Sequence, residues 1–272
     1  MASRITSGAM PVAVLAIAAT AVVSNSALAQ ATPPAFTMGW TVGNADTITY
    51  DWTQFGTLNG NGDWSVPGNE AIWSGWNYTG TLVGDGGAWQ FDWNTVFNVG
   101  EGVAAGVGAF VTANIVVTNN DIVNQSFSLL MTLPTGFLGT MLERGSIVGT
   151  ITDLTFDDAT VFAPAGGQIY TPLIDGVDEV PGFLMGEGFS ESAGGPLFSN
   201  SVGPADFGIP TPIAASQPVD SSIGILLSFD LTAGDSASFT AIFEVLPVPA
   251  PAGLPILAAA GLLAGRKRRR RR

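Results

Sequence analysis

The sequence predicts an all-β protein, an antiparallel β-sandwich of jelly-roll-like type with long Pro- and Gly-rich loops. Apolar and polar residues alternate with a period of two in several segments, which is typical of strands with one buried face. The 35 Gly and 17 Pro residues are too many for long helices. Residues 30–245 have the length of one all-β domain. We therefore expect a single sandwich domain over this range.

The strands are predicted from their alternating faces. The clearest one covers residues 89–99, and the others lie around 48–52, 127–133, 223–231 and 239–245. A turn at residues 232–235 joins the last two. In the clearest strand, one face carries Trp89, Phe91, Trp93, Phe97 and Val99, and the other carries Gln90, Asp92, Asn94 and Asn98.

A short internal repeat stands out in the first half of the domain. All seven Trp residues fall between positions 40 and 93, and those at 40, 52, 64 and 76 are spaced by twelve. Residues 52–62 resemble residues 76–86, so that a two-copy Trp/Gly hairpin repeat covers about 52–87. Two copies are too few for a solenoid, and a β-meander is the better interpretation.

Residues 156–220 differ from the rest of the domain. They contain eight Pro residues and many Gly, and the alternation is weak. We expect long loops with short strands here, decorating the sandwich rather than forming a second domain.

Charge excludes several functions. Arg144 is the only basic residue between positions 30 and 265, where all 22 acidic residues lie, so this stretch has a net charge of −21. Such a body is repelled by phosphate backbones, which excludes nucleic acid as a partner. The chain has no His and no Cys, which excludes Ser-His-Asp and Cys-His catalysis, the usual zinc ligands and disulfide bonds.

Residues 1–29 have the pattern of a secretory signal peptide. Arg4 precedes an apolar run at 10–23, and Ala27 and Ala29 form an A-x-A site that places cleavage before Gln30. This pattern predicts transfer across the membrane by Sec-type export machinery.

Residues 246–272 form a tail with three parts. A Pro-rich step at 246–252 is followed by an apolar run at 253–265 and by seven basic residues at 266–272. A short hydrophobic helix over 252–265 would reach only about 21 Å, less than the ~30 Å of a bilayer core. The basic block would stay on the cytoplasmic side, which leaves the domain outside.

This tail resembles the PEP-CTERM sorting signal in its VPxPA-type variant. In that family a membrane-embedded exosortase recognises and cleaves the tail, and the protein reaches the cell surface or the exopolysaccharide matrix. The commonest motif of the family has Glu where this chain has Ala250, and an ordinary tail anchor is the alternative. The matching residues are Val248, Pro249, Ala250, Pro251 and Ala252 in the motif, and Arg266, Lys267 and Arg268 at the start of the basic block.

The Trp residues are candidates for stacking on sugar rings. Trp73 and Trp76 fall on opposite strand faces, so at least one of them is expected to be exposed or to cover a sheet edge. The alternative is that the Trp residues fill the sandwich core, which we expect of Trp89 and Trp93.

We expect no cofactor and no metal site, and calcium is the one alternative that the carboxylates allow. An EF-hand-like loop would use Asn59, Asn61, Asp63 and Glu70, but Trp64 stands where that loop needs Gly. Clustered surface acids also serve solubility alone. Two other groups could supply oxygen ligands from a loop, namely Asp175, Asp178 and Glu179, or Asp153, Asp157 and Asp158.

The sequence therefore predicts a non-enzymatic, exported protein of the cell surface or extracellular matrix with a structural or adhesive role. Nothing in the sequence selects two carboxylates for glycoside hydrolysis. The alternative function is a carbohydrate-binding module that uses exposed Trp residues, with calcium as an aid. The expected partners are the export machinery, an exosortase-like protease and an exopolysaccharide.

Overall fold

The computed structural model describes residues 36–43, 48–51, 57–58, 64–66, 71–74, 77–98, 108–135, 139–195 and 197–248. All of them belong to one compact unit, Pro33–Arg272. The predicted signal peptide, and the predicted sorting tail beyond Val248, lie outside the described residues.

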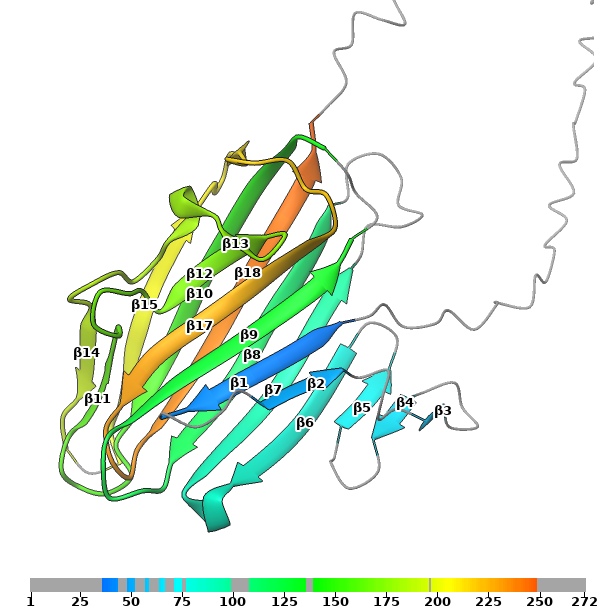
Figure 1. Cartoon of the computed structure of the whole chain (residues 1–272). Helices are drawn as coiled ribbons and strands as arrows, with labels where there is room; N and C mark the ends of the chain where they lie inside the picture. The colour runs from blue at the N-terminus through cyan, green and yellow to red at the C-terminus, as the bar shows by residue number, and fades with distance from the viewer. Residues whose placement is uncertain are drawn as a thin grey trace, which may run out of the picture. The chain divides into compact units, whose positions relative to one another are not determined.

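The described strands form two antiparallel sheets (Figure 1). Along the main path of the first sheet the order is β13 (Val177–Asp178), β12 (Tyr170–Ile174), β17 (Ser222–Leu231), β9 (Gln125–Pro134), β1 (Thr37–Val42) and β2 (Ile48–Asp51). Beside this path, β11 (Ala159–Phe162) pairs with β17 and with β14 (Ser190–Ala193). Two short 3-10 turns, Asp85–Gly87 and Val180–Gly182, connect strands.

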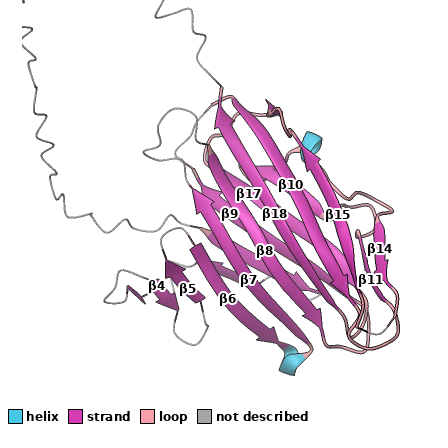
Figure 2. Ribbon diagram, turned by 180° about the vertical axis from the view of Figure 1, so that it is seen from behind, coloured by secondary structure: helices cyan, strands magenta, loops and turns pink. Residues whose placement is uncertain are grey.

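The second sheet is the larger one and is seen well from behind (Figure 2). Beside the main path of this sheet, β16 (Ile213–Ala214) pairs with β10. The order of the main path is β15 (Ser199–Phe207), β10 (Met141–Thr152), β18 (Ser236–Pro247), β8 (Ala109–Asn119), β7 (Trp89–Asn98), β6 (Asn77–Gly84), β5 (Ala71–Ser74), β4 (Trp64–Val66) and β3 (Thr57–Leu58).

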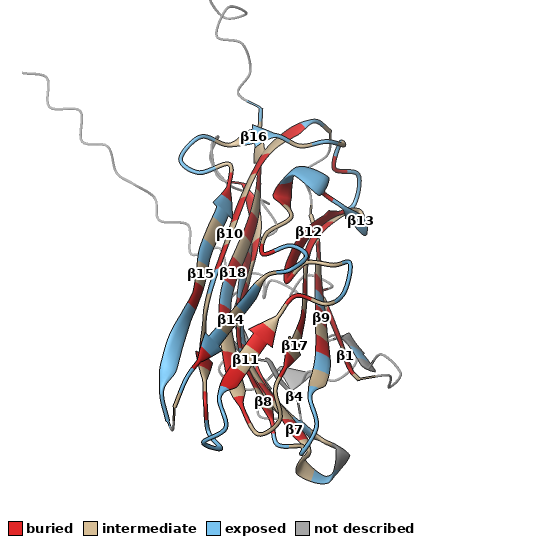
Figure 3. Cartoon of the chain, turned by 90° about the vertical axis from the view of Figure 1, so that its left-hand side faces the viewer, coloured by how far each residue is buried: buried red, intermediate tan, exposed pale blue. Residues whose placement is uncertain are grey.

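The two sheets pack face to face, with the core between them. Figure 3 shows β10, β15 and β18 on one side, β9, β12 and β17 on the other, and the buried residues between. Aromatic rings meet across the layers, since Phe229 of β17 and Phe239 of β18 have ring centroids 4.9 Å apart. Phe91 of β7 and Phe127 of β9 are 5.7 Å apart in the same way. The prediction of an all-β antiparallel sandwich is confirmed.

The strongest alternating segments form strands with the expected buried faces. Trp89 and Trp93 of β7 are only 5% and 6% exposed, as expected of core residues. On β17 every second residue from Ile223 to Leu231 is buried, and β9 and β18 show the same alternation. Burial of one sheet face against another therefore accounts for the period of two in these segments.

The Trp-rich half of the domain adopts a meander. Strands β3 to β8 follow one another in the sheet in the order of the sequence, each antiparallel to the next. The two hairpins expected from the repeat correspond to β3–β4 and β6–β7, while Trp52 and Trp76 lie outside the described residues.

Residues 156–220 contribute strands to both sheets. β11 to β14 lie in the first sheet, and β15 and β16 in the second. β12 is buried along its whole length. The 3-10 turn at Val180–Gly182 packs against it, because a Cβ on Gly182 would lie 2.4 Å from the ring of Pro172. This segment is therefore integrated into the sandwich more closely than its Pro and Gly content indicates.

Candidate functional site

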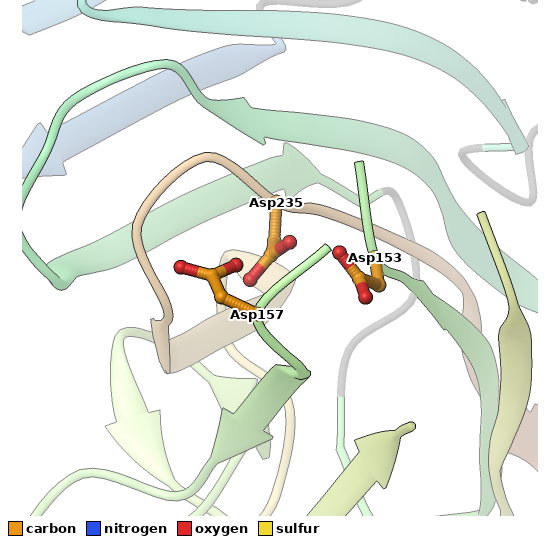
Figure 4. A group of neighbouring side chains, drawn as sticks. All are labelled: Asp153, Asp157 and Asp235. Carbon is orange, nitrogen blue, oxygen red and sulfur yellow. The ribbon is translucent and has the colours of Figure 1, made fainter. Parts of the chain in front are cut away.

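Three carboxylates converge at one end of the sandwich. Asp153 and Asp157 lie in the loop after β10, and Asp235 ends the turn between β17 and β18 (Figure 4). One carboxylate oxygen of each residue lies within 4.8 Å of one from each of the other two. Asp153 and Asp235 are fully buried, whereas Asp157 is exposed. The group is thus anchored in the protein and open to solvent at one side.

Asp153 is held by its own loop. Its Oδ1 accepts hydrogen bonds from the backbone N–H groups of Thr155 (3.0 Å) and Phe156 (2.8 Å). Its own N–H donates to the carbonyl of Phe198 at 3.0 Å. The second oxygen, Oδ2, is buried, and no donor within the described part of the chain reaches it. A buried carboxylate oxygen without a partner is costly, so Oδ2 requires a ligand, a water or a proton.

Asp235 ties the two loops together. Its Oδ2 accepts a hydrogen bond from the hydroxyl of Thr232 (2.5 Å), and its Oδ1 accepts one from the backbone N–H of Leu154 (3.3 Å). Burial raises the pKa of Asp235, and the charges of Asp153 and Asp157 act in the same direction, although the two hydrogen bonds oppose the rise. The surroundings of Asp235 therefore disfavour its anionic form.

The third carboxylate, that of Asp157, lies on the solvent-exposed side of the group. Asp157 accepts a hydrogen bond from the hydroxyl of Thr155 at 2.5 Å. Thr155 also packs against the turn that carries Asp235, because a Cβ on Gly234 would lie 2.3 Å from its Cγ2. Gly234 has a φ of +74°, so both its conformation and this close approach require glycine.

One of the loop groups expected from the sequence comes together in part. Asp153 and Asp157 converge as predicted. Asp158 does not join them, because its Oδ1 accepts a hydrogen bond from the backbone N–H of Gly195 at 3.1 Å. The third carboxylate of the group is instead that of Asp235, which lies almost eighty positions after Asp157 in the chain. The sequence marks Asp235 only as the end of a hairpin turn.

The other loop group does not form a cluster of ligands within the described residues. Asp178 is exposed and Glu179 is buried. Asp175 instead holds the start of β17, since its carboxylate accepts hydrogen bonds from three backbone N–H groups at 220–222 and from the hydroxyl of Ser221. Burial acts to raise the pKa of Asp175, but these hydrogen bonds outweigh it and lower the pKa. Asp175 is therefore a structural residue.

Glu143 of β10 and Glu179, which precedes the 3-10 turn at Val180–Gly182, are two buried carboxyl groups that interact electrostatically. Both residues are fully buried. Neither oxygen of Glu143, nor Oε2 of Glu179, has a hydrogen-bond partner within the described residues, while Glu179 Oε1 accepts a bond from the N–H of Ser216 at 2.5 Å. Burial, and secondly the charge of Glu179, raise the pKa of Glu143 to about 8. Glu143 is therefore neutral in the folded protein at pH 7.

The remaining predicted site residues lie mostly outside the described residues. Val248 is described and exposed, and it follows the last residue of β18. Trp73 lies in β5, opposite Trp64 of β4, but its side chain is not described. The residues outside are Ala27, Ala29 and Gln30 at the predicted cleavage site, Pro249, Ala250, Pro251, Ala252, Arg266, Lys267 and Arg268 in the tail, Trp76, and Asn59, Asn61, Asp63 and Glu70.

No protein-family model matches the chain, and no curated protein matches it. Among the described residues, no helix has both the length and the apolar character needed to cross a membrane.

Proposed function

We propose that this chain is an exported, non-enzymatic protein of the bacterial cell surface or extracellular matrix, in which the β-sandwich is a structural or adhesive unit. The observation that carries the proposal is the order of the parts: an apolar leader, a β domain, a Pro-rich step, an apolar run and a basic block. Among the described strands, β18 ends at Pro247, directly before Val248, the first residue of the predicted sorting motif. This division supports a tail that acts in trafficking.

A non-enzymatic role is supported by the chemistry of the side chains. The chain has neither His nor Cys, which removes the most common general bases and nucleophiles. Its one cation between positions 30 and 265, Arg144, forms an ion pair with Glu244 at 2.6 Å. The acidic domain suits a hydrated matrix, where its net charge keeps the protein soluble.

The test is the mass of the protein at its destination. The full-length gene is expressed in a bacterium with an exosortase, and the protein extracted from the cell surface is measured intact. The expected form begins at Gln30 and lacks residues 266–272. The matched variant replaces the seven basic residues with Ser and should be mislocalised or unprocessed, because charge is proposed to stop translocation. A surface form that retains the basic block contradicts the sorting proposal. A Ser variant processed and localised like wild type contradicts the role of charge and shows that the tail is recognised through its sequence.

The second candidate function is carbohydrate binding through Trp73 or Trp76. It draws no support from the three described Trp side chains, because Trp40, Trp89 and Trp93 are all buried. Polysaccharide pull-down with the extracted protein separates the two functions. Saturable binding that is lost in Trp73→Ala or Trp76→Ala favours the carbohydrate-binding module.

A further inference from the structure

We propose that Asp153, Asp157 and Asp235 form a calcium-binding site that joins the loop after β10 to the turn between β17 and β18. The inference concerns the folded domain alone, and it stands whether or not the tail directs the protein to the surface. It goes beyond the proposed function because it assigns a ligand to named residues.

The first support for a calcium site is that three carboxylates converge. The three carboxylates come from two loops that are separate in the chain, and one oxygen from each lies within 4.8 Å of the others. Figure 4 shows the side chains of Asp157 and Asp235 facing each other, with Asp153 beside them. A cation between carboxylates at this separation would offset the repulsion among them.

The second support is the unsatisfied oxygen on Asp153. This side chain is fully buried, and while Oδ1 is occupied by two backbone N–H groups, Oδ2 has no partner within the described residues. A solubilising surface acid would have water at both oxygens. A bound cation satisfies the buried oxygen and offsets the charge that burial would otherwise disfavour.

The loop and the turn that carry the three carboxylates are held together by hydrogen bonds. The two loops are already fixed by the bonds that Asp235 accepts from Thr232 and Leu154. A cation at this point therefore meets a largely preformed group of ligands.

The ligand type indicates calcium among the common cations. All three ligands are carboxylates, and the chain has no His or Cys to favour zinc or copper. Calcium accepts six to eight oxygens in flexible geometry, which suits carboxylates that bind through one or two oxygens and leave room for water. Magnesium demands a stricter octahedron and gives up its water reluctantly. The exposed Asp157 provides a route from solvent.

Calcium titration tests the site directly. The protein extracted from cells that express the full-length gene is stripped with a chelator and titrated with CaCl2 up to about 10 mM in a calorimeter, which covers the weak extracellular range. We expect one saturable event, a higher thermal midpoint with calcium, and weaker binding of MgCl2. Asp157→Asn should weaken calcium binding at least about tenfold, since even second-shell partners of a metal are worth 10–100-fold.

Two further variants keep the result interpretable. Asp206→Asn removes one exposed negative charge from β15 and should bind calcium as wild type does. Asp235→Asn should abolish binding, with circular dichroism to show that the sandwich is intact. Asp157 is exposed, so Asp157→Asn remains informative if Asp235→Asn does not fold. The proposal is overturned by no saturable calcium binding to wild type, by wild-type affinity in Asp157→Asn, or by magnesium binding as tightly as calcium.

Discussion

Gly80 lies directly opposite Trp93 in the β6–β7 ladder, and the indole ring of Trp93 occupies the space where a side chain on Gly80 would stand. A Cβ on Gly80 would be 2.2 Å from Cζ2 of Trp93. Gly84 and Trp89 have the same relationship, at 1.9 Å. Gly80 and Gly84 therefore make room for the two buried indoles of the facing strand.

Substitution of Gly80 should destabilise the domain. Gly80→Ala forces Trp93 out of its position, and overpacking of this kind typically costs about 1–3 kcal/mol. Urea unfolding should show the midpoint falling at constant slope. Val83→Ala, at an exposed position of the same strand, is the control and should change the free energy of unfolding little. Equal stability of Gly80→Ala and wild type would mean that the Trp93 indole can adopt another position without loss of packing.

The hydroxyl of Tyr170 should contribute to the attachment of one sheet to the other. It belongs to β12 and donates a hydrogen bond to the carbonyl of Ile242 on β18, at 2.9 Å. Tyr170→Phe removes the donor and should lower the free energy of unfolding by about 1–2 kcal/mol. Chemical denaturation measures the loss. A variant as stable as wild type would show that the hydroxyl adds nothing beyond the packing of its ring.

Glu143 should make stability depend on pH. Its pKa is about 8 in the folded protein against an ordinary value of 4.5, mainly because it is buried and secondly because of electrostatic repulsion from Glu179. Between these two pH values the folded state binds more protons than the unfolded chain, so the free energy of unfolding falls as the pH rises. The contribution of protonated Glu143 to the free energy of unfolding is fully present below pH 4.5 and is lost above pH 8.

Replacing Glu143 by Gln tests that dependence. Glu143→Gln carries no charge at any pH, so its stability relative to wild type should be greater at pH 8.5 than at pH 5, by about 3–4 kcal/mol. Glu187→Gln, at an exposed site, is the control and should follow the wild-type profile. Parallel stability profiles for wild type and Glu143→Gln between pH 5 and 8.5 would contradict the assignment.

The ion pair of Arg144 and Glu244 should contribute little. The two residues face each other in the β10–β18 ladder, and two nitrogens of Arg144 contact Oε2 of Glu244 at 2.6 Å. The Arg144 side chain is 41% exposed, so water and salt screen the pair. A double-mutant cycle with Arg144→Gln and Glu244→Gln should give a coupling below about 1 kcal/mol that decreases with salt. A coupling that is larger and independent of salt would contradict this prediction.

The alternation of apolar and polar residues predicted those strands that have one buried face and one face exposed to solvent. β7, β9, β17 and β18 meet this condition, and their alternation is visible in the sequence. β12 does not, because it is buried on both faces and contains Pro172, so its sequence has no period of two. Likewise Glu143 is a polar residue at a core position of β10, which an alternation pattern cannot anticipate.

The candidate site was predicted in part for a related reason. Asp153 and Asp157 are close in the sequence, so a loop that holds both could be proposed from spacing alone. Asp235 joins them because β18 pairs with β10 along its whole length, which brings the turn before β18 beside the end of β10. Such pairing between distant strands depends on the packing of both sheets, and no local signal in the sequence reports it.

The position of β18 determines how the domain would respond to mechanical load. This strand is paired with β10 on one side and β8 on the other, and it is the last strand before the predicted tail. Tension on a tethered tail would run along β18 and load both ladders in shear, so their hydrogen bonds would have to rupture together rather than one after another. The three aspartates lie at the opposite end of β18, beside its first residue. A cation bound there would link the start of β18 to the loop after β10 and so resist the removal of the strand from the sheet.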